Sequence, residues 1–505
     1  MSLLKSLVKQ SATYGVSSIL GRIINFLLVP FYTNPSWTGI DLKEFGIYSE
    51  LYAYMAFLNI IYLFGMETTF FRFSTKENML KDEVYNSSES VIFTTSLFFS
   101  SLLILLSGPI SELLNYPEKR AYIILLSLIL AVDAIVAIPF AKLRLENKAK
   151  SFAIFKLINI FLNVFFNIFF LYFCWQVHLG KLFPVLKPVI ELIYIPDFQV
   201  GYIIVSNLLA NTLQIPFLWS SFKNLRFHIN FKILREMFKY SYPLMFMGLA
   251  GMVNEVLDRI LLRVMLPHGF YPGKSTLEAI GIYGACYKLS MFMSLAIQAF
   301  RYAADPFFFS HSKEENSFNL FAVIMKYFII SCTIIYVLVG ANLQIFGLIL
   351  RSPAYREGLI IVPFLLLANL FLGIYINLAA WYKLTDKTYA GTVITFIGAG
   401  ITVGANIILI PILGYLGAAI ATLLCYAGMA MVGYFWGQKH FPVPYNVFSA
   451  VAYLTASSAI VWISIEYIPF TGPGRSIMGI AFTLLYIIAI VLIEKNNLRK
   501  DLRQM

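Results

Sequence analysis

The chain has 505 residues, of which 59% are hydrophobic, 16% aromatic and only 13% charged, and its mean hydropathy is +0.76. This composition excludes an ordinary soluble domain and is typical of a protein embedded in a bilayer. The formal net charge of +12 is dispersed over short loops, so it favours membrane topology and attraction to anionic lipid headgroups over a nucleic-acid partner.

Apolar windows of roughly 20 residues recur along the whole length, each long enough to cross a hydrocarbon core of about 30 Å as a helix. A membrane barrel would need alternating segments of about ten residues, which the sequence does not contain. We therefore predict an all-α polytopic membrane protein of about fourteen transmembrane helices. The expected spans are 11–33, 45–71, 89–111, 120–141, 151–174, 200–220, 237–266, 278–303, 320–341, 358–382, 390–411, 415–437, 447–468 and 476–494.

Lysine and arginine gather in alternate loops, which sets the expected orientation. The loops after spans 2, 4 and 6 contain both residues, and the stretch before span 1 contains Lys5 and Lys9. Because cytoplasmic loops carry the excess of basic residues, these loops and both termini are predicted to be cytoplasmic. The N-terminal MSLLKSLVKQ leads directly into a polar-striped helix, so we expect no cleavable signal peptide.

One loop resembles a nucleotide-binding motif but departs from it. GFYPGKST, residues 269–276, has three residues between its glycines where a phosphate-binding loop needs four, and it is expected on the outer face. The four cysteines form no CxxC pair and are interpreted as small core residues. We therefore expect no nucleotide cofactor, and the sequence identifies no metal ligands.

The sequence repeats itself with an offset of about 237 residues. GRIINFLLVP at 21–30 matches DRILLRVMLP at 258–267, so Arg22 corresponds to Arg259. Internal repeats are frequent in transporters, whose binding sites lie at the repeat interface. The other pairs are FGIYSELY (45–52) with IGIYGACY (280–287), RLENKAK (144–150) with KLTDKTY (383–389), and FNIFF around Asn167 with ANIIL around Asn406.

Each repeated unit covers about six helices, an even number, so both units enter the membrane from the same side and their symmetry axis follows the membrane normal. We expect an N-lobe at 1–222, a C-lobe at 223–440, and two extra helices with a cytoplasmic tail at 441–505. The lobes are predicted to face each other across a crevice, with the extra helices as an appendage.

Charged and polar residues within the spans indicate a functional face. A charge at the bilayer centre costs roughly 2.5 to 3.5 kcal/mol, so it should face the bundle interior or water. In span 1, helical geometry places Arg22 on one polar face with Tyr14 and Asn25. Further intramembrane charges are Glu255, Asp258, Arg259 and Arg263 in span 7, where Glu255, Arg259 and Arg263 form one stripe, Lys288 in span 8 and Asp133 in span 4.

Two interpretations of these charges stay open. They can pair with one another and only lock the helices, as Glu255 and Arg259 at i and i+4 can, or they can bind a ligand. The cationic members favour an anionic ligand, because guanidinium and ammonium groups make charge-assisted contacts to phosphate oxygens.

Span 5 carries Lys156, Asn159, Asn163 and Asn167 on one face, and its amides can bridge helices or bind sugar hydroxyl groups. The tyrosines of the two GIY sequences, at 46–48 and 281–283, are expected at the lipid headgroups, beside a close-contact glycine.

KSLVKQSATYGVSSILGRIINFLLVPFYT at 5–33 and IPFAKLRLENKAKSFAIFKLINIFLN at 138–163 add a family resemblance. With the twin six-helix lobes and two extra helices, the chain resembles the polysaccharide-transporter branch of the multidrug/oligosaccharidyl-lipid/polysaccharide (MOP) exporter superfamily. Members of this branch are Wzx-type flippases of lipid-linked oligosaccharides, related to lipid II flippases. The resemblance covers essentially the whole chain.

The resemblance implies flipping of an undecaprenyl-pyrophosphate-linked glycan across the bacterial inner membrane by alternating access, with basic residues holding the pyrophosphate. No bond is made or broken, and an ion gradient of Na⁺ or H⁺, the membrane potential or product consumption would drive it. The implied partners are the lipid-linked glycan, membrane lipids and polysaccharide assembly proteins, with the chain working as a monomer. The candidate substrate-binding residues are Arg22, Arg259, Arg263, Lys288, Asn25, Tyr14, Asn159 and Asn163, and the candidate ion-coupling residues are Asp133, Glu255, Asp258 and Asn406.

Alternative functions stay open at this point. Lipid II is another cargo of the same chemistry, and a drug or organic-cation antiporter of the same superfamily would prefer an acidic, aromatic cavity. A membrane glycan polymerase or glycosyltransferase would place acid, base or metal-binding residues in a sizeable extramembrane loop. The longest expected outer loop, about 175–199, is short and interrupted by prolines.

Overall fold

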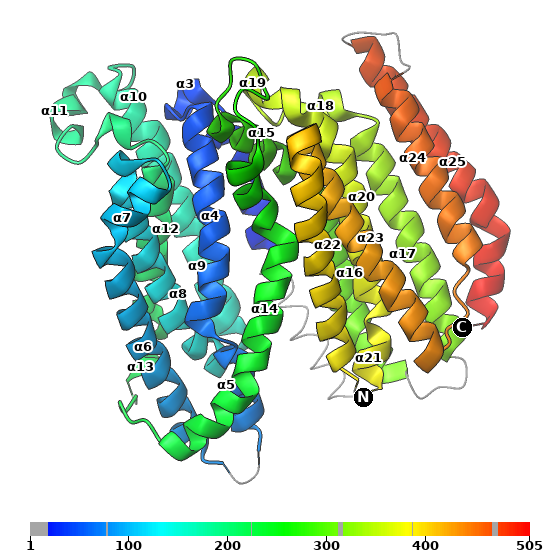
Figure 1. The fold of residues 1–505 in the computed structure, drawn as a ribbon, viewed down its shortest axis with the longest axis horizontal. Coiled ribbons are helices and arrows are strands. Elements are labelled where there is room, and N and C mark those ends of the chain that lie inside the picture. Colours follow the sequence, from blue (N-terminus) through cyan, green and yellow to red (C-terminus); the bar gives the residue numbers. More distant parts are fainter. Residues whose placement is uncertain are drawn as a thin grey trace. The chain divides into compact units, whose positions relative to one another are not determined.

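The structure, a computed structural model, describes residues 19–76, 79–223, 225–311, 317–385, 387–466 and 473–504, and within them the regular elements are helices (Figure 1). This confirms the predicted all-α membrane fold. Contacts between Cα atoms divide the chain into two compact units, Met1–Met252 and Val253–Met505, which are described separately below.

Short turns connect most helices of the first unit, whereas residues 179–200, which include α11, separate α10 from α12. Asp41 caps α4 by accepting a hydrogen bond from the backbone N–H of Glu44 at 2.7 Å. A π-helical turn at Phe169–Cys174 joins α9 to α10. The helices are α2 (Val29–Tyr32), α3 (Pro35–Thr38), α4 (Leu42–Leu63), α5 (Met66–Ser74), α6 (Lys81–Leu105), α7 (Ser107–Leu113), α8 (Arg120–Leu145), α9 (Ala149–Ile168), α10 (Trp175–His178), α11 (Lys187–Ile190), α12 (Gly201–Leu213) and α13 (Trp219–Phe222), and α14 (Phe231–Met265) begins here.

The break between α4 and α5 depends on a glycine. Phe64 and Gly65 both have positive φ, at 33° and 73°, a conformation that glycine adopts without steric cost. A Cβ atom on Gly65 would lie 2.9 Å from Cβ of Leu244 on α14. The missing side chain therefore allows the first half of α14 to pack against this turn, beside a core that also includes Met66, Phe70 and Met237.

In the second unit, a capping box of Ser275 and Glu278 starts α15. The consecutive helices α22 and α23 pack against each other, and α23 packs on α20 around a core that includes Tyr375, Ile394 and Met429. The helices are α15 (Thr276–Leu289), α16 (Met291–His311), α17 (Ser317–Gly340), α18 (Leu343–Gly347), α19 (Pro353–Arg356), α20 (Val362–Leu378), α21 (Ala380–Leu384), α22 (Tyr389–Leu413), α23 (Tyr415–His440), α24 (Val447–Glu466) and α25 (Pro473–Gln504).

The two C-terminal helices α24 and α25 pack on α17 (Figure 1). Polar contacts fix them there. The Lys326 ammonium lies 2.5 Å from Oε2 of Glu494, and the Tyr453 hydroxyl donates to Oε1 of the same carboxylate at 2.6 Å. The amide Nδ2 of Asn342 donates to the Thr483 hydroxyl at 3.1 Å. Helices without counterparts in the sequence repeat are thus anchored by a buried ion pair.

Among the described residues, eleven helices are long and apolar enough to cross a bilayer, and the bent pair Thr276–Leu289 and Met291–Tyr302, with a 42° break, makes a twelfth. The expected span at 237–266 coincides with α14, whose charged stripe lowers its hydropathy. The expected span at 11–33 coincides with the apolar helix Ile19–Tyr32, and its first residues lie outside the described part. The number fourteen therefore stays a prediction.

Candidate functional site

Arg259 is the centre of a polar cluster in the second unit. Its Nη1 lies 3.3 Å from Oδ1 of Asp258 and donates to the backbone carbonyl of Glu255 at 3.2 Å. The guanidinium carbon lies 4.2 Å from the centre of the Tyr287 ring, a cation–π distance. Both charged side chains are largely buried, with 11% of Arg259 and 3% of Asp258 exposed. The guanidinium is therefore held in one orientation.

The carboxylate of Asp258 has a second partner on α15. The buried Tyr283 hydroxyl donates to its Oδ2, while its Oδ1 accepts from the Arg259 backbone N–H at 2.8 Å. This corrects the interpretation of the second GIY sequence: Tyr283 is fully buried and bonded to an acid, rather than placed at the headgroups. The ion-pair partner of Arg259 is likewise Asp258, whereas Glu255 contributes its backbone and has an exposed side chain.

Lys288 adds a second cation to this cluster. It is half-buried on α15, one residue after Tyr287, and its ammonium is repelled by the charge of Arg259. Among the residues that the structure describes, no hydrogen bond or ion pair neutralises Lys288. Arg263, one turn after Arg259 on α14, is also half-buried. Two neighbouring cations with one close carboxylate favour the binding of an anion.

A neutral network continues the polar stripe of α14 by one turn. Asn254 donates from Nδ2 to the Thr395 carbonyl at 3.2 Å and accepts from the Thr402 hydroxyl at Oδ1, also at 3.2 Å. Asn406, predicted as an ion-coupling residue, is fully buried and donates to the Thr402 carbonyl at 2.8 Å. Its Oδ1 has no hydrogen-bond donor within the described residues.

The first unit has a cluster built from amides and one acid. Nδ2 of Asn211 on α12 donates to Oδ1 of Asp133 on α8 at 2.6 Å. Oδ1 of Asn211 accepts from Nδ2 of Asn159 on α9 at 2.8 Å. A single asparagine therefore connects three helices. Asn159 thus bridges helices, one of the two roles expected for it, and a role toward sugar hydroxyl groups stays a prediction.

Lys156 and Asn163 extend the same face of α9 in opposite directions. The Lys156 ammonium lies 4.1 Å from the centre of the Phe140 ring and is attracted by the Asp133 charge. Asn163 accepts two hydrogen bonds from Nδ2 of Asn167, at its carbonyl (2.8 Å) and its Oδ1 (3.1 Å). The Tyr32 hydroxyl donates to Oδ1 of Asn167 at 2.9 Å, so this part of the stripe joins α9 to α2.

The predicted residues of the first span are only partly described. Arg22 and Asn25 are both exposed on the surface of their helix. Tyr14 lies outside the described residues. The structure therefore brings together Asp258, Arg259 and Lys288 in one unit and Asp133 with Asn159 in the other, while Arg22 and Asn25 have no described polar partner.

Several members of these clusters were not singled out from the sequence. Asn207 donates to the Tyr52 hydroxyl at 3.0 Å, and Asn211 lies one turn further along α12. Their i, i+4 spacing in an apolar helix is the signal that identified the α9 stripe, and it could have identified them too. Tyr287 and Asn254 carried no comparable signal.

Comparisons with known proteins agree with this architecture. The chain matches the family model described as Polysaccharide biosynthesis protein over residues 7–312, more than half of its length. A comparison with curated proteins finds no match. A solved structure of the lipid II flippase MurJ in an inward closed conformation has a TM-score of 0.67 at 15% sequence identity, covering 96% of this chain and 99% of that one.

Two transporters share the fold at similar distance. An inward-facing multidrug resistance MATE family transporter of the MOP superfamily has a TM-score of 0.61 at 13% identity, covering 87% of this chain and 99% of its own. The MATE transporter VcmN of Vibrio cholerae in the bent form has a TM-score of 0.52 at 13% identity, covering 91% and 100%. The chain is a multi-pass membrane protein with the fold of MOP superfamily transporters, and it belongs to the polysaccharide biosynthesis protein family.

Proposed function

We propose that the protein is a flippase that moves an undecaprenyl-pyrophosphate-linked oligosaccharide from the cytoplasmic to the outer leaflet of the bacterial inner membrane. Membership of the polysaccharide biosynthesis family and the transporter fold support this class of function. The observation that carries the choice of an anionic cargo is the cation pair of Arg259 and Lys288, inside a membrane-spanning unit, with Asp258 as its close counter-charge.

A pyrophosphate is the ligand that this pair suits. The guanidinium of Arg259 is oriented by Asp258 and the Tyr287 ring, so little side-chain entropy is lost when it binds phosphate oxygens. An unneutralised cation in the membrane costs roughly 2.5 to 3.5 kcal/mol, which an incoming diphosphate offsets. Arg22 and Arg263 are further candidate contacts to the headgroup, and Asn25, Tyr14, Asn159 and Asn163 are candidate contacts to the glycan.

Transport then proceeds by alternating access, in which the bound headgroup is exposed first to the cytoplasm and then to the outside, while the prenyl tail stays in lipid. No covalent bond changes, so the protein acts as a transporter and not as an enzyme. Asp133, Asp258, Glu255 and Asn406 are the candidate sites for coupling to Na⁺ or H⁺. Both termini lie in the cytoplasm, and polysaccharide assembly proteins are the proposed partners of a monomeric transporter.

The test is a flipping assay with purified protein in vesicles, using a fluorescent undecaprenyl-pyrophosphate trisaccharide and a membrane-impermeant quencher. We expect R259Q to lower the initial rate at least tenfold, equivalent to about 1.4 kcal/mol or more. R259K should lie between R259Q and wild type, because an ammonium lacks the planar fork of guanidinium. The matched control is R226Q, which removes an exposed arginine from a loop and should change the rate less than twofold.

Full flipping by R259Q would contradict the proposed role of the cation pair. The same vesicles separate the alternative functions. A strong preference for lipid II would reassign the cargo, and efflux of organic cations by R22D with undiminished glycan flipping would point to an antiporter. Conversion of the lipid-linked glycan to a new product without any gradient would indicate an enzyme. Imposed Na⁺, H⁺ and potential gradients, applied one at a time, identify the driving force.

A further inference from the structure

A cavity of about 250 Å³ lies within the second unit, between helices α17, α20, α23 and α24, and none of the residues of the Arg259 cluster lines it. Its wall is almost entirely apolar, with Ile329, Ile374 and Ala450 contributed by three different helices. A cavity of this kind inside a membrane-spanning unit suits hydrocarbon and not water, because a buried water needs two to four polar partners. None of the residues that line the cavity is among the candidate substrate-binding or ion-coupling residues.

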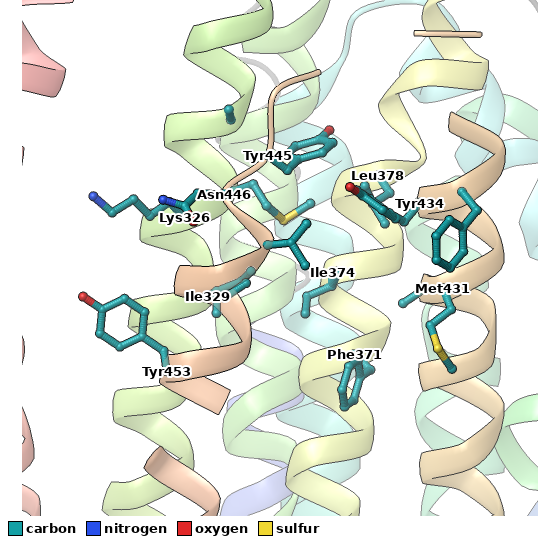
Figure 2. Close-up of a pocket in the computed structure, with 16 residues that line it drawn as sticks. Lys326, Ile329, Phe371, Ile374, Leu378, Met431, Tyr434, Tyr445, Asn446 and Tyr453 are labelled. Atoms are coloured by element: carbon teal, nitrogen blue, oxygen red, sulfur yellow. The ribbon is translucent and has the colours of Figure 1, made fainter. Parts of the chain in front are cut away.

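Tyr445 and Asn446 mark one end of the cavity (Figure 2). Figure 2 shows Tyr445 and Asn446 near one end and Phe371 and Met431 near the other. Tyr445 and Asn446 belong to the short connection between the end of α23 and the start of α24. Tyrosine is enriched at the level of lipid headgroups, because its ring is apolar and its hydroxyl is polar. The cavity therefore runs from the headgroup region toward the bilayer interior.

The cavity is open toward lipid along α23 and α24. Met431 and Phe435 line it and are nevertheless 56% and 66% exposed, and Val447 is 44% exposed. On helices that cross a bilayer, exposed apolar side chains of this kind face the hydrocarbon of the membrane. A chain of a neighbouring lipid can therefore enter sideways without leaving an apolar environment.

Lys439 lies at the headgroup end of this opening. Lys439 follows Phe435 at i+4, so it lies on the same face of α23 one turn nearer the helix end, and it is exposed. The other lysine at the cavity, Lys326, is held by Glu494 at 2.5 Å. Figure 2 shows Lys326 and Tyr453 extending to the same side. Lys439 is therefore the group available to a phosphate.

We propose that this cavity is a binding site for one acyl chain of an anionic phospholipid, whose phosphate contacts Lys439 and the polar groups of Tyr445 and Asn446. A bulk phospholipid is the chosen occupant because binding follows concentration by mass action, and bilayer phospholipids surround the opening at far higher concentration than any lipid-linked glycan. The site would fix α24 against α23 and would be occupied whether or not cargo is present.

The experiment uses the full chain in vesicles of phosphatidylcholine that contain 1% of a phosphatidylglycerol carrying a photoactivatable diazirine on one acyl chain. Cross-linked peptides are mapped by mass spectrometry. We expect labelling of the peptides that contain Phe371 and Met431 to exceed, at least fivefold, labelling of the lipid-facing residues Ile408 and Ile412 on α22, which are 62% and 65% exposed outside the cavity. Equal labelling of the two surfaces would overturn the proposal.

Filling the cavity supplies the matched comparison. A450F places a ring in the cavity, whereas A452F adds the same ring to an exposed position two residues further along α24. We expect A450F to lower cavity labelling at least fivefold and A452F to leave it within twofold of wild type. I374F, from α20, is a second filling variant in case A450F does not fold. Undiminished labelling in a folded filling variant would overturn the proposal.

Two further experiments test the contact of Lys439 with the headgroup, and whether the bound hydrocarbon chain belongs to a phospholipid or to a polyprenyl lipid. K439Q should lower the preference for the phosphatidylglycerol probe over a matched phosphatidylcholine probe about threefold. An unchanged preference would overturn the assignment of Lys439. Unlabelled polyprenyl phosphate at 1% should not displace the phospholipid probe. If it does displace the probe, the cavity belongs to a prenyl chain and the phospholipid assignment is wrong.

Discussion

Tyr52 and Tyr287 occupy equivalent positions in the two copies of the sequence repeat, yet their neighbours differ. Tyr52 accepts a hydrogen bond from an amide, Asn207, whereas the ring of Tyr287 lies against the Arg259 guanidinium. The first unit thus builds its intramembrane cluster from amides around Asp133, and the second from cations around Asp258. The repeat preserves the helical frame, while the chemistry placed on that frame has diverged.

A second pair of equivalent residues shows the opposite behaviour. Asn167 and Asn406 are both fully buried, and each donates from Nδ2 to the carbonyl of the residue four positions earlier at 2.8 Å. This local bond depends only on the helix to which each residue belongs, so it survives in both copies. Contacts between helices, such as the Tyr32 bond to Asn167, are where the copies differ.

The largest loss of stability is expected from a variant that disrupts the cationic cluster. D258N removes a buried carboxylate and leaves the Arg259 guanidinium without its ion-pair partner, which typically costs about 3 to 5 kcal/mol. The matched variant D133N keeps an amide oxygen that can still accept from Asn211, so its effect should be clearly smaller. Thermal unfolding of both proteins in detergent compares them. Equal destabilisation would remove the distinction between the two clusters.

A medium effect is expected in the amide cluster. N211L removes the residue that connects α8, α9 and α12, leaving the Asp133 carboxylate and the Asn159 amide without this partner. The variant loses one hydrogen bond to the charged Asp133 and one to the neutral Asn159. We therefore expect a destabilisation of about 2 to 3 kcal/mol. L213A, at a 42%-exposed position on the same helix, is the control. A smaller effect of N211L than of L213A would contradict a bridging role.

The smallest effect compares the paired asparagines. Both variants lose the local Nδ2 bond, but N167L also loses the bond from Tyr32, so N406L should be less destabilising than N167L by about 1 kcal/mol. If the Asn406 acceptor serves ion coupling, N406L should still lower gradient-driven flipping. Stability and transport measured on the same preparations separate these effects. A large loss of stability in N406L would show that its Oδ1 has a structural partner.

Helical periodicity predicted which polar residues share one face of a helix, but it did not predict which residues of other helices they contact. The stripe of Asn159, Asn163 and Asn167 and the stripe of Glu255 and Arg259 follow from residue spacing along one helix, and the structure places polar contacts on both. Spacing does not reveal which helix lies opposite. The partner of Asn159 is 52 residues away in sequence, and Asn254 contacts Thr402 across 148 residues.

Tertiary contacts also explain why Arg259 pairs with Asp258 and not with Glu255. An i, i+4 pair is favoured on an isolated helix, but Asp258 is drawn inward by the Tyr283 hydroxyl on α15, and Arg259 follows it. Tyr283 was expected at the headgroups because tyrosine is common there. Its hydrogen bond to a buried acid depends on tertiary packing that no local pattern records.

The ion pair between Lys326 and Glu494 couples the C-terminal helices to the charge balance of the second unit. Glu494 on α25 supplies the carboxylate that neutralises Lys326 on α17, and both side chains are largely buried. A truncated chain ending before α24 would therefore lose the counter-charge that Glu494 gives to Lys326.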